Sequence, residues 1–447
     1  MLLTGRHHNS GEAASQARFP RVLKSRGETD TVAAMPGILH ALHRDSRRLY
    51  IALLSNCALF GVTMTLVGAS LPRLIRAFSW SYTVSGAVLA AGAMGYFVTT
   101  FVVGLVVHRF GSKRVLVVGL AVEALGLFLL ARHPSPVLNM ILNFGIGIGQ
   151  GCAEVVTNFG VIRMERPGES RLMNLVHASF CVGGVIGPLG VGAYIGLAER
   201  GGFDWRLLYP VIGALVVVAV VMFARLRFPD EPQPGGSHPD ETGASPAGAR
   251  VPTPVLALLT LMLLCYVGAE LGFSSWVSEY FVVVRSATPS FGALMVSVLW
   301  LGVLAGRLGF SFWFRSDRQD LAVVGLAVAS GLSILLLRAV GTLGAAVLAV
   351  LLTGLGFSGV YPMVMTLVGR WFRSARAVGI AATGGGLGSF LFPFLMGFLG
   401  EILGIESSIL FCAAATGLLA IVGGAVIVLR PRSTTPTAPT QARRHTE

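Results

Sequence analysis

The chain contains about twelve stretches that are apolar and long enough to cross a lipid bilayer, and this repetition restricts its fold more than any other feature. With 54% hydrophobic and only 12% charged residues, the composition lies outside the range of soluble globular proteins. Backbone groups in lipid must be satisfied internally, and the stretches lack the ten-residue alternation of a barrel, so we expect an all-α membrane protein. The predicted spans are roughly 50–72, 83–107, 114–131, 137–162, 172–198, 207–225, 253–283, 291–314, 321–338, 342–369, 377–402 and 407–429.

A segment at 229–252 that is rich in Pro, Gly, Asp, Glu and Ser divides these stretches six and six. Such a composition cannot bury a core and behaves as a linker. The two groups have a similar segment in equivalent places. Small residues recur before a proline in GGVIGPLGVG of the fifth stretch and in GGGLGSFLFPFLMG of the eleventh. We therefore expect an N-terminal cytoplasmic tail (1–49), a six-helix half (50–228), a cytoplasmic linker (229–252), a second six-helix half (253–430) and a C-terminal tail (431–447), with both tails disordered.

The basic residues behind the formal charge of +13 sit at the ends of the stretches rather than in one patch, which argues against nucleic acid as a partner. If the N-terminus is cytoplasmic, the cytoplasmic loops carry about twice as many Lys and Arg residues as the outer loops. This bias predicts a multi-pass protein of the cytoplasmic (inner) membrane with both termini inside. All five cysteines lie within predicted spans, so we expect no disulfide framework.

The fourth stretch is a membrane-length helix with one polar face. At about 100° per residue, its polar side chains fall within an arc of about 60°, and apolar side chains cover most of the remaining surface. A carboxylate near the middle of a bilayer costs several kcal/mol, so such a residue normally faces a bundle interior or a water-filled cavity. This face predicts a polar path through the protein, with a structural acid held by a neighbouring helix as the alternative. The face consists of Asn139, Asn143, Gln150, Glu154 and Thr157, with Asn158 beside it.

The loop after the second stretch, GLVVHRFGSKR at 104–114, resembles the signature of the major facilitator superfamily. The resemblance implies a fold of twelve transmembrane helices in two pseudo-symmetric six-helix halves. It also implies a gate that locks the halves on the cytoplasmic side, and Arg307 of the eighth stretch is expected to brace this gate. An Asp usually stands where this chain has His108, and a histidine there makes the lock pH-sensitive. From the loop, the implied gate residues are Gly104, His108, Arg109, Gly111, Lys113 and Arg114.

Within that superfamily, three stretches resemble the fucose permease and related sugar transporters: GIGIGQGCAEVVTNFGVIR at 145–163, NLVHASFCVGGVIGP at 174–188 and GAELGFSSWVSEYF at 268–281. The resemblance implies that Glu154 is the acid of proton coupling. The first stretch departs from the permease because GVTMTLVGASLP has no carboxylate, so fucose itself is not favoured and coupling rests on Glu154 with Glu270. The other matching positions are Asn158 beside that acid, the pair Asn174 and His177, and Trp276.

Several of these side chains are candidates for binding a solute. Asn143, Gln150 and Thr157 offer donors and acceptors to hydroxyl groups, with hydrogen bonds between helices as the alternative. Trp276 can stack on a sugar ring, but it shares a face with Glu270 only if the helix breaks near the glycines of GAELG; otherwise it belongs to the interfacial aromatic belt. Tyr361 of the tenth stretch is expected to line the cavity from the second half.

We therefore expect a secondary active transporter that moves a sugar or similar small polar solute by alternating access, through proton-coupled symport. Sodium coupling stays open. The alternative is proton-coupled efflux of drug-like amphiphiles, and a sensor that kept the scaffold is a third possibility. No phosphate loop, metal-spaced His/Cys set or nucleophile with its base stands outside the spans, so we expect no enzyme, cofactor or metal. The expected partners are a small-molecule substrate and membrane lipid, and the protein is expected to be a monomer.

Overall fold

The computed structural model describes residues 44–165, 171–228, 253–313, 318–372 and 374–429, and every regular element in these ranges is helical. The predicted linker, the predicted C-terminal tail and residues 1–43 of the predicted N-terminal tail lie outside the described residues. The helices are α2 (Arg44–Phe78), α3 (Tyr82–Phe110), α4 (Ser112–Leu129), α5 (Pro136–Met164), α6 (Arg171–Gly201), η1 (Trp205–Leu207), α7 (Leu208–Arg225), α8 (Thr253–Val284), α9 (Pro289–Trp313), α10 (Gln319–Ala339), α11 (Leu343–Phe357), α12 (Val360–Phe372), α13 (Ala375–Leu403) and α14 (Ile405–Leu429).

Among the described residues, eleven helical segments are long and apolar enough to cross a membrane. The helix that falls short by this criterion is α4, whose 18 residues include Lys113, Arg114 and Glu123. The segment from Leu343 to Phe372 counts as one span, although α11 and α12 are separated by a turn. The expectation of an all-α membrane fold is confirmed.

Two boundaries differ from the sequence-based expectation. The first helix begins at Arg44, so residues 44–49 are helical although we expected them in the tail. The stretch at 342–369 was expected as one helix, but a turn at Ser358 and Gly359 divides it into α11 and α12. Hydropathy does not detect such a turn, because the residues on both sides of it are equally apolar.

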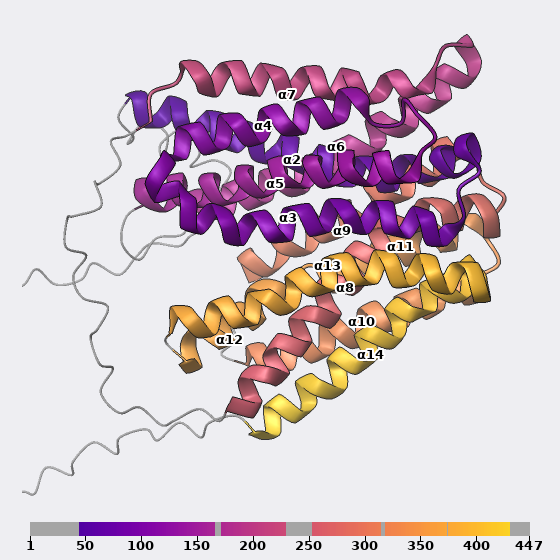
Figure 1. Ribbon diagram of the computed structural model, residues 1–447. Helices are drawn as coiled ribbons and strands as arrows, with labels where there is room; N and C mark the ends of the chain where they lie inside the picture. The colour runs from indigo at the N-terminus through magenta and orange to yellow at the C-terminus, as the bar shows by residue number, and fades with distance from the viewer. Residues whose placement is uncertain (1–43, 166–170, 229–252, 314–317, 373, 430–447) are drawn as a thin grey trace, which may run out of the picture. The chain divides into compact units, whose positions relative to one another are not determined.

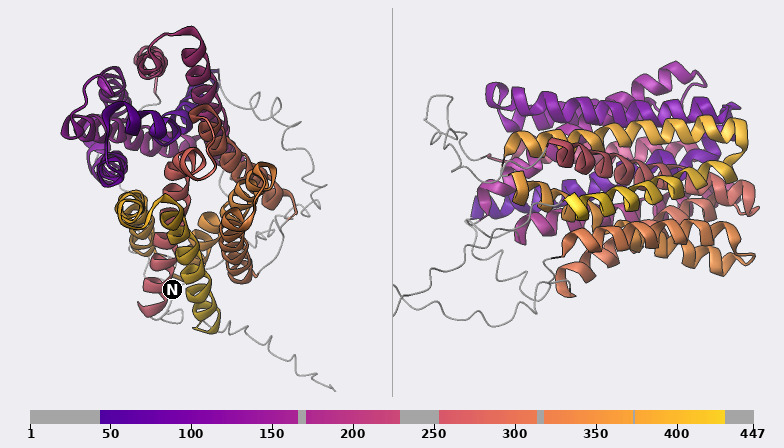
Figure 2. Two further views of the ribbon diagram at one scale, coloured as in Figure 1. Left: turned by 90° about the vertical axis from the view of Figure 1, so that its right-hand side faces the viewer. Right: turned by 90° about the horizontal axis from the view of Figure 1, so that it is seen from below.

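Helices α2 to α7 pack mainly on one another, and so do helices α8 to α14 (Figure 1). In the first group, α3 packs on α5 and α2 on α6; in the second, α8 packs on α13 and α14, and α9 on α11. The two groups, called the N-half and the C-half below, meet mainly where α6 contacts α9, α3 contacts α13 and α2 contacts α8. The two groups are also seen apart in the left-hand view of Figure 2.

The two similar glycine-rich segments, GGVIGPLGVG and GGGLGSFLFPFLMG, lie where helices approach closely. A Cβ at Gly187 on α6 would lie 2.9 Å from Val62 Cα, and a Cβ at Gly388 on α13 would lie 2.9 Å from Gly268 N. Pro188 is inside α6, as Pro393 is inside α13. The small residues therefore serve close packing at α2–α6 and α8–α13, which are equivalent places in the two halves.

The helices define two ends of the bundle. One end holds the turn between α3 and α4, where Gly111 has φ 82° and ψ 142°; we call it the Lys113 end. The opposite end holds the loop between α2 and α3 and the last turns of α8; we call it the Glu279 end.

Candidate functional site

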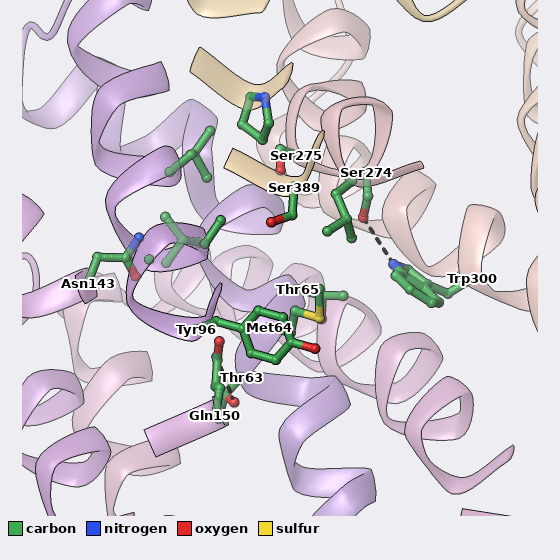
Figure 3. Close-up of a pocket in the computed structure, with 16 residues that line it drawn as sticks. Thr63, Met64, Thr65, Tyr96, Asn143, Gln150, Ser274, Ser275, Trp300 and Ser389 are labelled. Atoms are coloured by element: carbon green, nitrogen blue, oxygen red, sulfur yellow. Dashed lines mark hydrogen bonds between the residues drawn. The ribbon is translucent and has the colours of Figure 1, made fainter. Parts of the chain in front are cut away.

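A polar cavity of about 70 Å³ lies where the two halves meet (Figure 3). The N-half contributes α2, α3 and α5 to its wall, and the C-half contributes α8, α9 and α13. Many of the lining side chains carry neutral hydrogen-bonding groups, which can bind an uncharged polar solute. These polar lining residues are Thr63, Thr65, Tyr96, Asn143, Gln150, Ser274, Ser275, Trp300 and Ser389.

Two of the predicted substrate-binding residues, Asn143 and Gln150, line this cavity from α5. The Asn143 amide donates to the Val88 carbonyl at 2.7 Å, and the Gln150 amide donates to the Thr63 hydroxyl at 3.2 Å. Gly92 leaves room for Asn143, since a Cβ there would lie 2.6 Å from Nδ2. Both amides are therefore held by α2 and α3 and have hydrogen-bonding capacity left for a ligand.

The Tyr96 hydroxyl donates a hydrogen bond to the Glu154 carboxylate. Tyr96 lines the cavity from α3, and Glu154 lies half-buried on α5. The other ionisable neighbours of this acid are Cys57 from α2 and Tyr361 from α12. Among the described residues, no Lys, Arg or His forms an ion pair with Glu154.

The acid of the C-half has a different environment. The Tyr266 hydroxyl donates to Glu270 Oε1 at 2.7 Å, and the Arg307 guanidinium interacts electrostatically with both groups. Arg307 also reaches the N-half, where its Nη1 lies 3.2 Å from Cys181 Sγ. The sequence suggested a place for Arg307 at the gate, but the structure places it in the interior beside Glu270. The carboxylate offsets the cost of burying the guanidinium.

The tryptophan that lines the cavity is Trp300, not Trp276. Helix α8 is continuous through its glycines, so the break that would have turned Trp276 toward the cavity is absent from this described helix. Trp276 instead packs edge-on against Tyr82 and donates to the Pro393 carbonyl at 3.0 Å. Trp300 donates to the Ser274 hydroxyl at 3.0 Å. The spacing of Trp300 and Arg307 could have pointed to Trp300. The two residues are seven positions apart, or two helical turns, so they lie on the same face of α9.

Other predicted site residues lie away from the cavity. Thr157 is 2% exposed at the α2–α5 contact. Asn158 is half-buried, and Asn174 and His177 are exposed near the start of α6. Tyr361 is 37% exposed although it lies near Glu154 and its ring centroid is 6.4 Å from that of Tyr266.

The Glu279 end is closed by polar contacts between the halves. The Glu279 carboxylate on α8 lies 2.9 Å from the Arg76 guanidinium on α2 and accepts a hydrogen bond from the Tyr82 hydroxyl at 3.2 Å. Glu401 on α13 accepts a hydrogen bond of 2.7 Å from the Tyr82 backbone N–H. These contacts join α2, α3, α8 and α13 at this end of the bundle.

The predicted gate residues of the loop lie at the Lys113 end, and their partners belong to the N-half. The His108 ring packs edge-on against Phe159 at 5.8 Å, and Lys113 Nζ donates to the Leu226 carbonyl at 2.9 Å. A Cβ added at Gly104 would have no atom within 4 Å, apart from its own helix backbone and chain neighbours. Arg109 and Arg114 are exposed. The gating role of this loop stays a prediction.

A bundle of apolar helices in two groups, with a cavity that carries hydrogen-bonding side chains and with two acids in the interior near their junction, defines a membrane transporter. A model of the Major Facilitator Superfamily matches residues 51–369 and again 286–446, so the chain belongs to that superfamily. It is therefore a multi-pass membrane transporter and not an enzyme.

Two bacterial relatives resemble this chain. Protein TsgA of Escherichia coli O157:H7 is 30% identical over 62% of this chain and 68% of its own length. An uncharacterised MFS-type transporter of Yersinia pestis is 23% identical over 77% of this chain and 86% of its own length.

Solved structures share the fold at low sequence identity. A bacterial homologue of the human lysosomal transporter Spinster, inward-facing, has a TM-score of 0.66 at 15% identity and covers 87% of this chain and 97% of its own. The E. coli fucose:proton symporter FucP has a TM-score of 0.57 at 21% identity and covers 86% of this chain and 99% of its own.

Proposed function

We propose that this protein imports a sugar or a similar small polar solute together with protons, by alternating access. The observation that carries the proposal is the bond from Tyr96 to Glu154, because it joins a residue of the cavity wall to an acid that has no basic partner among the described residues. Proton binding at Glu154 would change the donor and acceptor pattern of Tyr96, and thus the affinity of the cavity for its solute.

The lining chemistry supports a polyhydroxylated solute. Asn143, Gln150 and Ser275 offer neutral donors and acceptors, and the Trp300 indole offers an apolar face of the kind that packs on a sugar ring. The fold is shared with FucP, described as a fucose:proton symporter, and the nucleoside transporter NupG has a TM-score of 0.66 at 15% identity. Both neighbours are consistent with a hydroxyl-rich solute.

We assign different roles to the two acids. Glu270 is neighboured by the Arg307 cation, and the negative charge of its carboxylate can balance the guanidinium. Glu154 has no such cation beside it among the residues that the structure describes, so it is the acid that exchanges its proton during the cycle.

The contacts at the two ends support an inward-facing state. The excess of basic residues supports a cytoplasmic position of the Lys113 end in an inner-membrane protein. The Glu279 end would then be the closed outer gate. Ligand pockets usually measure about 300–1,000 Å³, so the cavity of about 70 Å³ has to widen before it holds a solute.

Uptake into proteoliposomes tests this proposal. We expect at least one sugar of a labelled panel to accumulate when an inward proton gradient is imposed, and we expect Glu154→Gln to lose accumulation while it keeps solute exchange. Glu406→Gln is the matched control. Glu406 forms an ion pair with Arg338, and 45% of the Glu406 side chain is exposed. Equal accumulation by wild type and Glu154→Gln would contradict the role of Glu154.

Proton-coupled efflux of amphiphiles is the second candidate. Met64, Val67, Leu89 and Leu271 give part of the cavity wall an apolar character that suits such compounds. Absence of uptake for every sugar, together with proton-dependent export of a lipophilic cation, would favour this alternative.

A further inference from the structure

Another buried carboxylate, Glu123 on α4, lies behind the wall of the cavity. The residue is 2% exposed, and its neighbours come from two other helices of the N-half. Its Oε2 lies so near α5 that a Cβ on Gly149 would be 2.8 Å away. The hydroxyl of Thr63, on α2, faces the same carboxylate.

The groups around Glu123 are neutral. The titratable neighbour on α5 is the Cys152 thiol. Helix α7, which also packs on α4, has no titratable side chain between Tyr209 and Arg225. On α3, the charged residue closest to Glu123 along the chain is Arg109, which lies in the last turn of that helix, before the turn that leads into α4. Among the described residues, no Lys, Arg or His forms an ion pair with Glu123, so nothing compensates a negative charge there.

Thr63 links Glu123 to the cavity. A threonine hydroxyl has one hydrogen to donate and can accept two. The Gln150 amide donates to Thr63 Oγ1 at 3.2 Å, and the Phe60 carbonyl lies 3.3 Å from the same oxygen. If Glu123 is protonated, it can donate to Thr63, which then donates to Phe60. If Glu123 is ionised, the Thr63 hydrogen turns to the carboxylate instead.

The α2–α5 contact continues as a polar seam toward the Lys113 end. The Thr63–Gln150 bond and the contact between Gly160 and Leu53 fix the antiparallel register of these helices. Asn56 and Thr157 face each other in this register, each two turns from the Thr63–Gln150 bond. Among the described residues, neither the Asn56 amide nor the Thr157 hydroxyl has a hydrogen-bond partner, and both residues are 2% exposed. Such buried groups bind ordered water.

We propose that Glu123 is an additional proton-binding site, reached from the Lys113 end along the α2–α5 seam, and that its proton sets the orientation of the Thr63 hydroxyl, to which Gln150 of the cavity wall donates. The consequence for transport rests on the proposed function, because it assumes that Gln150 contacts the solute. Proton binding by Glu123 does not depend on that assumption.

Infrared difference spectroscopy of the full-length protein in liposomes, titrated from acid to alkaline pH, tests the proposal without a transported solute. A protonated carboxyl group has its own C=O stretch. We expect one pH-dependent carboxyl band that is lost in Glu123→Gln and retained in Glu154→Gln. A Glu123 band that is missing, or that has the same intensity at every pH, would overturn the proposal.

A second pair of variants keeps the test decisive if Glu123→Gln does not fold. Thr63→Val removes the hydroxyl that faces Glu123, so the Glu123 band should shift in frequency, whereas Thr63→Ser should leave it in place. An unshifted band in Thr63→Val would contradict the link between the two residues. If the band titrates but no proton-driven uptake is found, only the proposed function fails.

Discussion

The guanidinium of Arg76 on α2 lies 2.9 Å from the carboxylate of Glu279 on α8, and this ion pair joins the two halves at one end of the bundle. The carboxylate is buried, with 1% of its side chain exposed, whereas the Arg76 side chain is 42% exposed. Tyr82 adds a hydrogen bond from α3 to the same carboxylate. The closed end is therefore stabilised by one acid that has partners on two helices of the opposite half.

We expect Glu279→Gln to favour opening of this end. Loss of a partly exposed ion pair costs about 1 kcal/mol, which is a several-fold change in the open population. The measurement is the labelling rate of Ser275→Cys by a membrane-impermeant maleimide added from the Glu279 side; the native cysteines are buried and give little background. The control is Glu199→Gln, because Glu199 pairs with Arg73 inside the N-half at 3.2 Å. Equal labelling rates in the two variants would argue against this lock.

The electrostatic interaction of Arg307 with Glu270 predicts a rescue experiment. Arg307→Ala leaves the buried Glu270 carboxylate without its neighbouring cation. The cost should not exceed that of breaking a direct buried ion pair, about 3–5 kcal/mol. Adding Glu270→Gln to Arg307→Ala should recover a large part of that loss, as measured by thermal unfolding in detergent. Arg338→Ala, at an exposed pair, should cost at most about 1 kcal/mol. A double variant less stable than Arg307→Ala would disprove the pairing.

The two tryptophans near the junction of the halves should respond differently to substitution. Trp300→Phe removes the donor to Ser274 in the cavity wall. We therefore expect a KM for the transported sugar that is about fivefold higher, on the scale of one hydrogen bond of about 1 kcal/mol. Trp276→Phe removes the donor to the Pro393 carbonyl at a buried helix contact, and should lower thermal stability with little change in KM. The reverse pattern would place Trp276 at the solute.

The turn between α3 and α4 predicts a contrast between two glycines of one motif. Gly111 has φ 82° and ψ 142°, a conformation that costs other residues about 1–3 kcal/mol, so Gly111→Ala should lower the unfolding temperature. Gly104 lies inside α3 with free space at its Cβ position, so Gly104→Ala should be neutral or should raise stability by up to about 1 kcal/mol. Equal unfolding temperatures for both variants would show that the turn tolerates a side chain.

Much of the fold follows from local properties of the chain. Apolar length predicted the spans, and the polar face of the fourth stretch placed Asn143 and Gln150 together on one side of α5, where both line the cavity. The division of α11 from α12 and the early start of α2 were missed, because neither depends on hydropathy.

The sequence by itself determined that this chain spans a membrane as two groups of helices with acids in the interior, because span length, polar faces and loop charge are properties of single segments. The tertiary structure decided which groups these acids contact. Arg307 lies beside Glu270, Trp300 replaces Trp276 at the cavity, and Thr63 stands between Glu123 and Gln150. These pairings join segments far apart in the chain, and they depend on the rotation of each helix and on its register with its neighbours, which the pattern of one segment does not contain.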